Sequence, residues 1–225
     1  MNVLRTIQFP PPIGDLLRSL SEVGFFDRSL LIGSWVMLLY QELYGAPYAL
    51  RTLDVDFAVH LAHPHKQMRA DLERLITDLG FVDYIAAEGV QKFTALGYEV
   101  EFIAQRPGGR EIGALAVREW NLNALPLPFI SILTDFSETA VFDGFTLRFP
   151  IPEAFFVHKL IIAPRRPTDA KREKDLEQCA VLAPVLDDER LQRVMESQRF
   201  GKETKRHLAQ SCAAIGFPLQ KLILS

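Results

Sequence analysis

The stretch Arg51-Thr-Leu-Asp-Val-Asp-Phe-Ala-Val59 places two aspartates one residue apart inside an apolar, β-favouring run. Alternate side chains of a strand share a face, so Asp54 and Asp56 are expected to point the same way. The apolar residues that alternate with them are Leu53, Val55 and Phe57, and these are expected to point into a core. Two like charges held side by side are unfavourable unless a cation lies between them, and carboxylate oxygens suit Mg²⁺. An Asp-x-Asp pair also arises by chance in a chain of this length, so the neighbouring segments must decide its meaning.

Upstream of this stretch, the apolar run Leu30-Leu-Ile32 leads into Gly33 and Ser34, and a strong helix pattern follows from residue 35 to about residue 43. Glycine permits a tight strand-to-helix turn, Ser34 is expected to cap the helix, and the exposed amides at its start favour an anion. An ordinary strand-to-helix turn would contain the same two residues. The full order of strand, Gly-Ser turn, helix and Asp-x-Asp strand is more specific than any one part.

This combination resembles the polymerase-β-type nucleotidyltransferase superfamily, whose members carry a Gly-Ser or Gly-Gly turn, a helix and an Asp-x-Asp strand. The resemblance covers residues 30–59. It implies an α/β (α+β) fold with a mixed sheet flanked by helices. It also implies that Gly33 and Ser34 bind a nucleotide, and that Asp54 and Asp56 hold catalytic Mg²⁺ together with a third carboxylate on a later strand. Arg51, just before the acidic strand, is expected to bind a phosphate of the nucleotide or to pair with acids at the edge of the site.

Glu99 and Glu101 are the candidates for that third carboxylate, because residues 98–103 read as a strand after a turn at Gly97. The two glutamates share a face, so alternation cannot choose between them. The resemblance favours Glu101, which lies between apolar residues as the family pattern requires, although many members have Asp there. The alternative is that both glutamates line the solvated face of an antiparallel strand.

A second region, residues 149–178, adds independent weight. Pro152 opens a helix that places Lys159 on an otherwise apolar pattern, and a Lys-Asp pair, Lys174-Asp175, follows in a second charged helix. This order resembles minimal nucleotidyltransferases, including toxin components of abortive-infection systems, where such residues lie beside the nucleotide. Lys159 is expected to be a surface-accessible point charge for triphosphate oxygens, and Asp175 to orient it or act as a base. Gln178 stands where the family pattern has a second Asp, and a solvated helix surface would explain the same charges.

The composition is that of an ordinary globular protein: 225 residues, 48% hydrophobic, 24% charged, with a formal net charge of −3. The chain has no overall basic charge of the kind that many nucleic-acid binders show. The two cysteines, Cys179 and Cys212, fit a reducing compartment, and no apolar run reaches membrane-spanning length. We therefore expect a cytoplasmic protein without a membrane partner. The sequence contains no Gly-x-Gly-x-x-Gly, Walker-type or Gly-x-Ser-x-Gly motif, which weakens kinase, dehydrogenase and hydrolase functions.

The chain is expected to divide near residue 150, into a nucleotidyltransferase core (1–150) and a helical C-terminal region (151–225). In the first part, short β-like runs cover residues 81–86, 91–96, 98–103, 128–133, 138–142 and 145–149, and helices are expected at 13–23 and 66–79. Asp143-Gly144 predicts a two-residue hairpin turn. In the second part, helices are expected at 152–163, 168–183, 187–197 and 201–214.

The predicted reaction is transfer of a nucleoside monophosphate from an NTP to an acceptor hydroxyl, with two Mg²⁺ ions held by Asp54, Asp56 and Glu101. The acceptor could be a tRNA end, a protein side chain or a small molecule, and the sequence does not choose among them or define an oligomeric state. The competing hypothesis is a catalytically weak or inactive protein that keeps the fold and acts as a nucleotide- or partner-binding module. The incomplete pattern at Asp175 and Gln178 favours that alternative.

Overall fold

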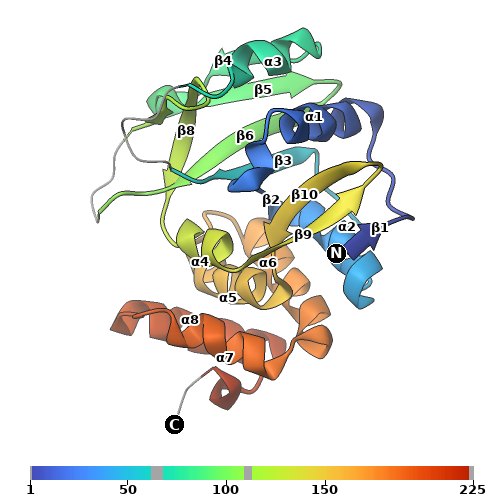
Figure 1. Ribbon diagram of the computed structural model, residues 1–225. Coiled ribbons are helices and arrows are strands. Elements are labelled where there is room, and N and C mark those ends of the chain that lie inside the picture. Colours follow the sequence, from blue (N-terminus) through green and yellow to red (C-terminus); the bar gives the residue numbers. More distant parts are fainter. Residues whose placement is uncertain (1, 62–67, 109–112, 223–225) are drawn as a thin grey trace.

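The protein is built around a seven-stranded mixed sheet, seen in a computed structural model that describes residues 2–61, 68–108 and 113–222 (Figure 1). Along the main path the strand order is β2-β3-β6-β5-β4, and β8 pairs with both β6 and β7. The strands are β2 (Leu30–Ile32), β3 (Asp54–Val59), β4 (Val82–Ile85), β5 (Gln91–Ala95), β6 (Tyr98–Gln105), β7 (Leu115–Val117) and β8 (Leu122–Leu127). β3 and β6 run parallel at the centre, which confirms the mixed α/β architecture predicted from the sequence.

Side-chain alternation gives the two central strands one aromatic face and one acidic face. Phe57 of β3 stacks on Phe102 of β6 with ring centroids 5.4 Å apart, and Phe25 packs edge-on against both rings. These rings are buried in the main core. Because neighbouring residues in a strand point to opposite sides, the acidic residues of β3 and β6 are directed to the other face of the sheet.

A smaller sheet joins β1 (Asn2–Leu4), β9 (Ser137–Phe142) and β10 (Phe145–Pro150). β9 and β10 form the predicted hairpin. Asp143 and Gly144 have φ values of 45° and 83°, the conformation that a two-residue turn with positive φ at both positions requires. In Figure 1 this sheet lies beside the main sheet, next to α2.

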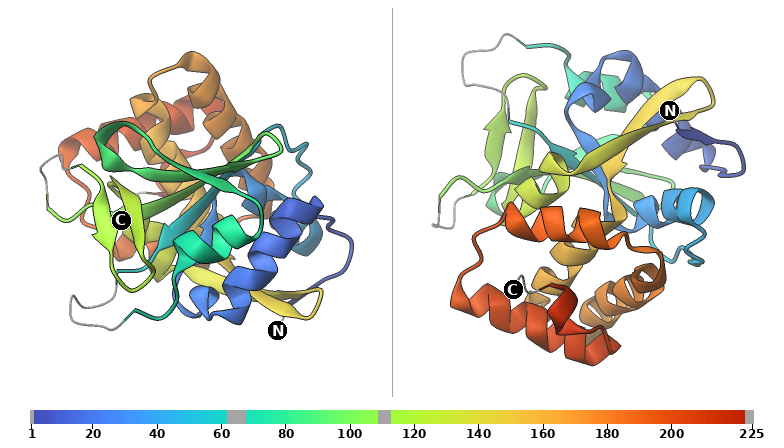
Figure 2. Two further views of the ribbon diagram at one scale, coloured as in Figure 1. Left: turned by 90° about the horizontal axis from the view of Figure 1, so that it is seen from above. Right: turned by 60° about the horizontal axis from the view of Figure 1, so that its bottom comes forward.

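Helices cover both faces of the main sheet. The helices of the first half are α1 (Pro11–Glu22), α2 (Val36–Tyr44), α3 (Leu72–Asp78) and α4 (Ile130–Asp135), and those of the second half are α5 (Pro152–Ile162), α6 (Asp169–Leu182), α7 (Asp188–Glu196) and α8 (Lys202–Ile215). Short 3₁₀ turns lie at η1 (Phe25–Asp27), η2 (Gly33–Trp35), η3 (Ala87–Gly89), η4 (Ala163–Arg165), η5 (Ala183–Val185) and η6 (Leu219–Lys221). Figure 2 shows the helices after Pro150 gathered on one side of the sheet.

Three local predictions from the sequence are wrong. Residues 128–133, expected as a strand, belong in part to α4, whose Ile130 and Leu133 pack on Ile103 and thereby satisfy a helical rather than a two-residue period. The helix expected over 66–79 begins only at Leu72, because Asp71 caps it by accepting a hydrogen bond from the amide of Arg74. Residues 66–67 of the expected helix lie outside the described part of the chain. Leu53 is 52% exposed because β3 starts one residue later. β1, β7 and β8 were not expected at all.

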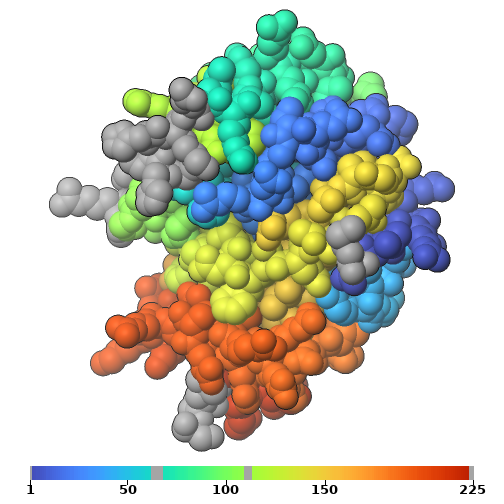
Figure 3. Space-filling model, in the orientation of Figure 1, coloured from blue at the N-terminus to red at the C-terminus, as the bar shows by residue number. Residues whose placement is uncertain are grey.

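The helices after Pro150 share their core with the α/β half. One hydrophobic cluster contains residues from Leu4 to Leu222, and the hydroxyl of Tyr40 donates to the backbone carbonyl of Pro150 at 2.7 Å. The space-filling view shows the two halves in continuous contact (Figure 3). The division at residue 150 stays a prediction. In the described residues no helix is long and apolar enough to cross a membrane.

Candidate functional site

A cleft of about 530 Å³ lies between the acidic face of the sheet and the helices α4, α5 and α6, which Figure 1 shows below the sheet. Among the sequence-predicted residues, it is lined by Gly33, Ser34, Asp54, Asp56, Glu101, Lys159 and Asp175. Its remaining wall is partly apolar, with contributions from β8 and α4. A second hollow, about 440 Å³ between α1 and α3, contains none of these residues.

Strand register brings four carboxylates to one face. Asp54 lies opposite Glu99 and Asp56 lies opposite Glu101 in the parallel pair of β3 and β6. Burial raises the pKa of Asp56 from 3.8 to about 6, and the charge of Glu101 raises it further than that of Asp54, while Lys159 opposes the shift. Glu101 is therefore the glutamate with the stronger effect on the pKa of Asp56. Glu99 accepts a hydrogen bond from the hydroxyl of Tyr84.

Gly33 allows the turn before α2 to lie directly against Asp56. It has φ of +69°, and a Cβ at this position would stand 2.2 Å from Oδ2 of Asp56. Any side chain there would displace the carboxylate, so the glycine is required for both its conformation and its size.

The sequence predicted that Ser34 caps the helix. This prediction is wrong, because no side chain caps the start of α2. The Oγ of Ser34 instead accepts a hydrogen bond of 2.9 Å from Nε2 of Gln178, a buried residue of α6 that also donates to the hydroxyl of Tyr48 at 3.0 Å. Gln178, the departure from the family pattern, thus ties α6 to the Gly-Ser turn. An aspartate in its place could not donate these bonds.

A second set of charges lies across the cleft on α5, η4 and α6. Lys159 Nζ is 2.5 Å from Oδ1 of Asp175, and Nε of Arg166 is 2.5 Å from Oδ2 of the same carboxylate. Burial acts to raise the pKa of Asp175, but the two cations hold it below its usual value. Lys159 is only 5% exposed, so the expectation of a surface-accessible lysine is wrong. It is a buried cation whose partner is the residue predicted to orient it.

His158, next to this lysine, is a buried cleft residue whose Nδ1 has no partner in the described part of the protein. Burial lowers the pKa of His158 to about 3, and the charge of Lys159 adds to the effect. The ring is therefore neutral at physiological pH. Lys171 and Lys174 of α6 also line the cleft, and they make no ion pair with the described residues.

Arg51 is the predicted site residue that the structure does not bring to the cleft. Its side chain is 72% exposed and lies 4.0 Å from Glu177, and it is not among the residues that line the cleft. Thr52, one residue later, does line it.

The residue that sequence reasoning missed is Lys92 of β5. Its Nζ lies 2.6 Å from Oε1 of Glu99 and 3.2 Å from Oε1 of Glu101. Burial disfavours its charge, but the hydrogen bond to Glu99 and the charge of Glu101 outweigh burial and raise the pKa of Lys92. A signal was present in the sequence: a two-residue turn at Leu96-Gly97 pairs Lys92 with Glu101 across the hairpin.

The donors in the cleft suit a hard divalent cation, because Asp54 and Asp56 offer carboxylate oxygens that no ion pair with a described residue occupies. Burial and then the charge of Glu101 raise the pKa of Asp56, and a cation bound beside it would favour its charged form. Among the described residues, however, no three acidic, histidine or cysteine side chains form a complete metal-binding group. Glu101 forms an ion pair with Lys92.

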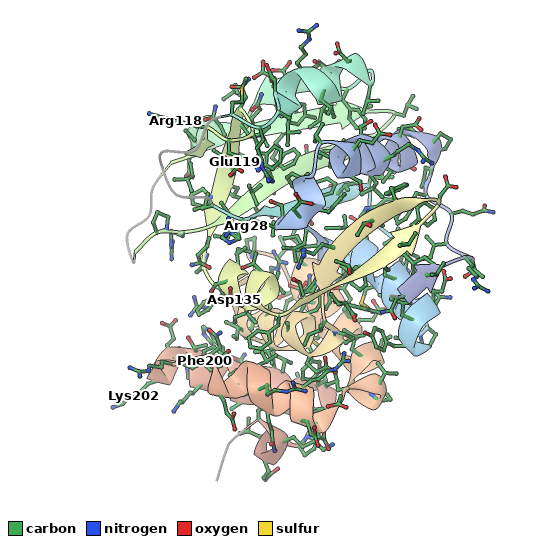
Figure 4. All side chains as sticks on the ribbon, in the orientation of Figure 1. Arg28, Arg118, Glu119, Asp135, Phe200 and Lys202 are labelled. Atoms are coloured by element: carbon green, nitrogen blue, oxygen red, sulfur yellow. The ribbon has the colours of Figure 1, made fainter. Side chains whose placement is uncertain are left out.

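Another polar cluster lies outside the cleft. Nη2 of Arg28 is 2.9 Å from Nε2 of His60, and Nε of Arg69 is 3.4 Å from Glu119; Figure 4 labels Arg28 and Glu119. Burial, and then the charge of Arg28, lowers the pKa of His60. None of these residues lines the cleft, so they do not belong to the site.

Comparison with known proteins places the chain in a family. A family model described as a nucleotidyltransferase matches residues 12–199. No curated protein is similar enough to be matched. Two solved structures are similar, each with a TM-score of 0.46 and each covering 92% of this chain. One is an antigenic nucleotidyltransferase-like protein from Paracoccidioides brasiliensis, with 15% identity over 88% of that chain. The other is the antibiotic-resistance factor ANT(2'')-Ia, with 13% identity over 92% of that chain.

Proposed function

Since the chain belongs to the nucleotidyltransferase family, we propose that its cleft transfers a nucleoside monophosphate from an NTP to an acceptor hydroxyl. The observation that carries the proposal is the pair Asp54 and Asp56. These carboxylates face a cleft beside a glycine turn, without a cationic partner among the described residues, and opposite a wall of lysine and arginine. An acidic half and a basic half suit a substrate that arrives as a metal-bound triphosphate.

On this proposal, Asp54 and Asp56 hold Mg²⁺, with Glu101 as the third carboxylate of the site. Nucleotidyltransferases typically use a divalent metal. When bound, such an ion neutralises charge on the attacking and leaving oxygens of the transfer. The aspartates would orient the ion, and the missing side chain of Gly33 leaves the Asp56 carboxylate in its place against the turn.

The phosphates would be bound from two sides. The amides of Gly33 and Ser34 lie at the start of η2 and α2, where backbone N–H groups favour an anion. Lys171 and Lys174 of α6 provide positive charges that no ion pair with a described residue occupies. Lys159, which is paired with Asp175, lines the same wall of the cleft. Arg51 would then act at the outer edge of the site, where its exposed side chain lies 4.0 Å from Glu177.

We propose no single acceptor: an RNA end, a protein side chain and a small molecule are all candidates, and the toxin-like role suggested by the resemblance stays a prediction. A cytoplasmic location also stays a prediction. It is supported by the two cysteines, which are buried and unpaired, as in a reducing compartment.

One observation favours the second candidate, a nucleotide-binding protein with little activity. The third carboxylate, Glu101, is paired with Lys92 instead of being left open for a metal. A protein that only binds nucleotide would tolerate this pairing, whereas a catalytic site that needs three free carboxylates would not.

Labelling decides between the two. Purified protein is incubated with each α-labelled NTP, Mg²⁺ and cell extract, and the RNA, protein and small-molecule fractions are then counted. Incorporation into one fraction supports the enzyme and identifies the acceptor class. The control is Asp54→Asn, which removes a charge from an exposed residue and is expected to abolish labelling without unfolding the protein. NTP binding by calorimetry with no incorporation from any NTP would support the second candidate.

A further inference from the structure

The four carboxylates of the cleft are not equivalent, although they share one face of the sheet. Glu99 and Glu101 have a fixed cation, because Nζ of Lys92 contacts an oxygen of each at 2.6 and 3.2 Å. Asp54 and Asp56 form no ion pair with the described residues. The acidic face is therefore neutralised by the protein on one half only.

Lys92 is held in this position by the fold rather than by side-chain flexibility. β5 pairs antiparallel with β6, and its register places Lys92 directly opposite Glu101, which in turn lies directly opposite Asp56 on β3. The three residues form one row across three adjacent strands. The side chain of Lys92 is only 22% exposed, so its charge is poorly screened by solvent.

A second metal ion on this face would need Glu101 as a ligand, and one oxygen of that carboxylate, Oε1, is already 3.2 Å from Nζ of Lys92. A second divalent cation on Glu101 would stand beside an ammonium group a few ångströms away, and like charges at that distance repel strongly in a partly buried site. One divalent cation on the free aspartates meets no such repulsion.

We propose that Lys92 takes the place of a second metal ion, so that this site binds one divalent cation, on Asp54 and Asp56, with the Lys92 ammonium as the fixed positive charge beside Glu101. This inference rests on the proposed function, since it assumes that the aspartates bind a metal. It replaces the two-ion expectation from the sequence. It also explains why Glu101 is paired in a protein of an enzyme family.

The test is the number of Mn²⁺ ions bound per chain, measured by electron paramagnetic resonance of free Mn²⁺ in a titration without nucleotide. Wild-type protein is expected to bind one ion. Lys92→Met, which keeps the length of the side chain and removes its charge, is expected to bind two. Lys92→Arg, which keeps the charge, and Lys171→Met, which removes a different cleft lysine, are both expected to bind one.

Two ions on the wild-type protein would overturn the inference and leave the proposed function standing. One ion on Lys92→Met would also overturn it, provided that thermal melting shows a folded variant. If Lys92→Met does not fold, the numbers of Mn²⁺ ions bound by the wild type and by Lys92→Arg decide. Two ions on either protein would refute the proposal that Lys92 takes the place of a metal ion. No Mn²⁺ bound by the wild type would overturn the inference and the metal part of the proposed function together.

Discussion

Replacing Asp56 with asparagine is expected to stabilise the metal-free protein while destroying its function. Burial and neighbouring carboxylates raise the pKa of Asp56 from 3.8 to about 6, so its negative charge is unfavourable in the folded state. One pKa unit corresponds to about 1.4 kcal/mol, so the shift sets an upper limit of about 3 kcal/mol on the free energy by which this charge destabilises the folded state. Asp56 is partly exposed, and solvent reduces this value, so we expect Asp56→Asn to raise the free energy of unfolding by about 1–2 kcal/mol at pH 7.5.

The pH dependence has a definite sign. The folded-state pKa of this acid lies above its unfolded value, so the native state holds the proton more tightly. The destabilising charge is fully present above pH 6 and disappears as the pH falls towards 4. The advantage of Asp56→Asn over the wild type should therefore be largest at pH 7.5 and vanish near pH 4.

Urea unfolding in EDTA at these two pH values measures the effect. Asp54→Asn is the matched control, because Asp54 is exposed, and it should change stability by less than about 0.5 kcal/mol. Saturating Mg²⁺ should stabilise the wild type and not Asp56→Asn, because only a native-state ligand raises the free energy of unfolding. The reasoning is refuted if Asp56→Asn is no more stable than the wild type at pH 7.5 in EDTA.

Two further predictions concern the turn and the buried ion pair. Gly33→Ala and Gly45→Ala impose similar backbone strain, with φ of +69° and +71°, and this strain should lower the free energy of unfolding by about 1 kcal/mol in each. Only Gly33→Ala places a methyl group against Asp56, so only it should lower labelling, by more than about tenfold, and equal activities of the two variants would contradict this. Lys159→Met removes one of the two cations beside the buried carboxylate of Asp175 and should lower the free energy of unfolding in urea by about 2–3 kcal/mol, part of which the double variant Lys159→Met/Asp175→Asn should recover. A loss below about 0.5 kcal/mol in Lys159→Met would mean that the pair contributes nothing to stability.

The family and the central part of the fold were accessible from the sequence, because both depend on local patterns. Alternation along residues 51–59 and 98–103 predicted two strands with acids on one face, and the structure has both, the first from Asp54. The Gly-Ser turn between β2 and α2 was equally readable, since the positive φ of Gly33 excludes most other residues. The family match over residues 12–199 confirms the resemblance to nucleotidyltransferases that these patterns carried.

Prediction failed where packing overrides local preference. Residues 128–133 are as apolar as a strand, and the choice of helix for α4 depends on the groove beside Ile103 that its side chains fill. The strands β7 and β8 gain stability from pairing with each other and with β6, which a single segment does not reveal.

The sequence by itself determined which residues can carry the chemistry: a glycine that can adopt positive φ, two aspartates on one face of a strand, and a lysine followed by an aspartate on two later helices. These properties depend on the backbone periodicity of short segments, so they are fixed before the chain folds. Only the tertiary structure decided how the charges are shared. Lys159 is committed to Asp175, Gln178 to Ser34, and Lys92 to Glu101, because each of these pairs joins elements that meet only when the sheet and its helices are assembled.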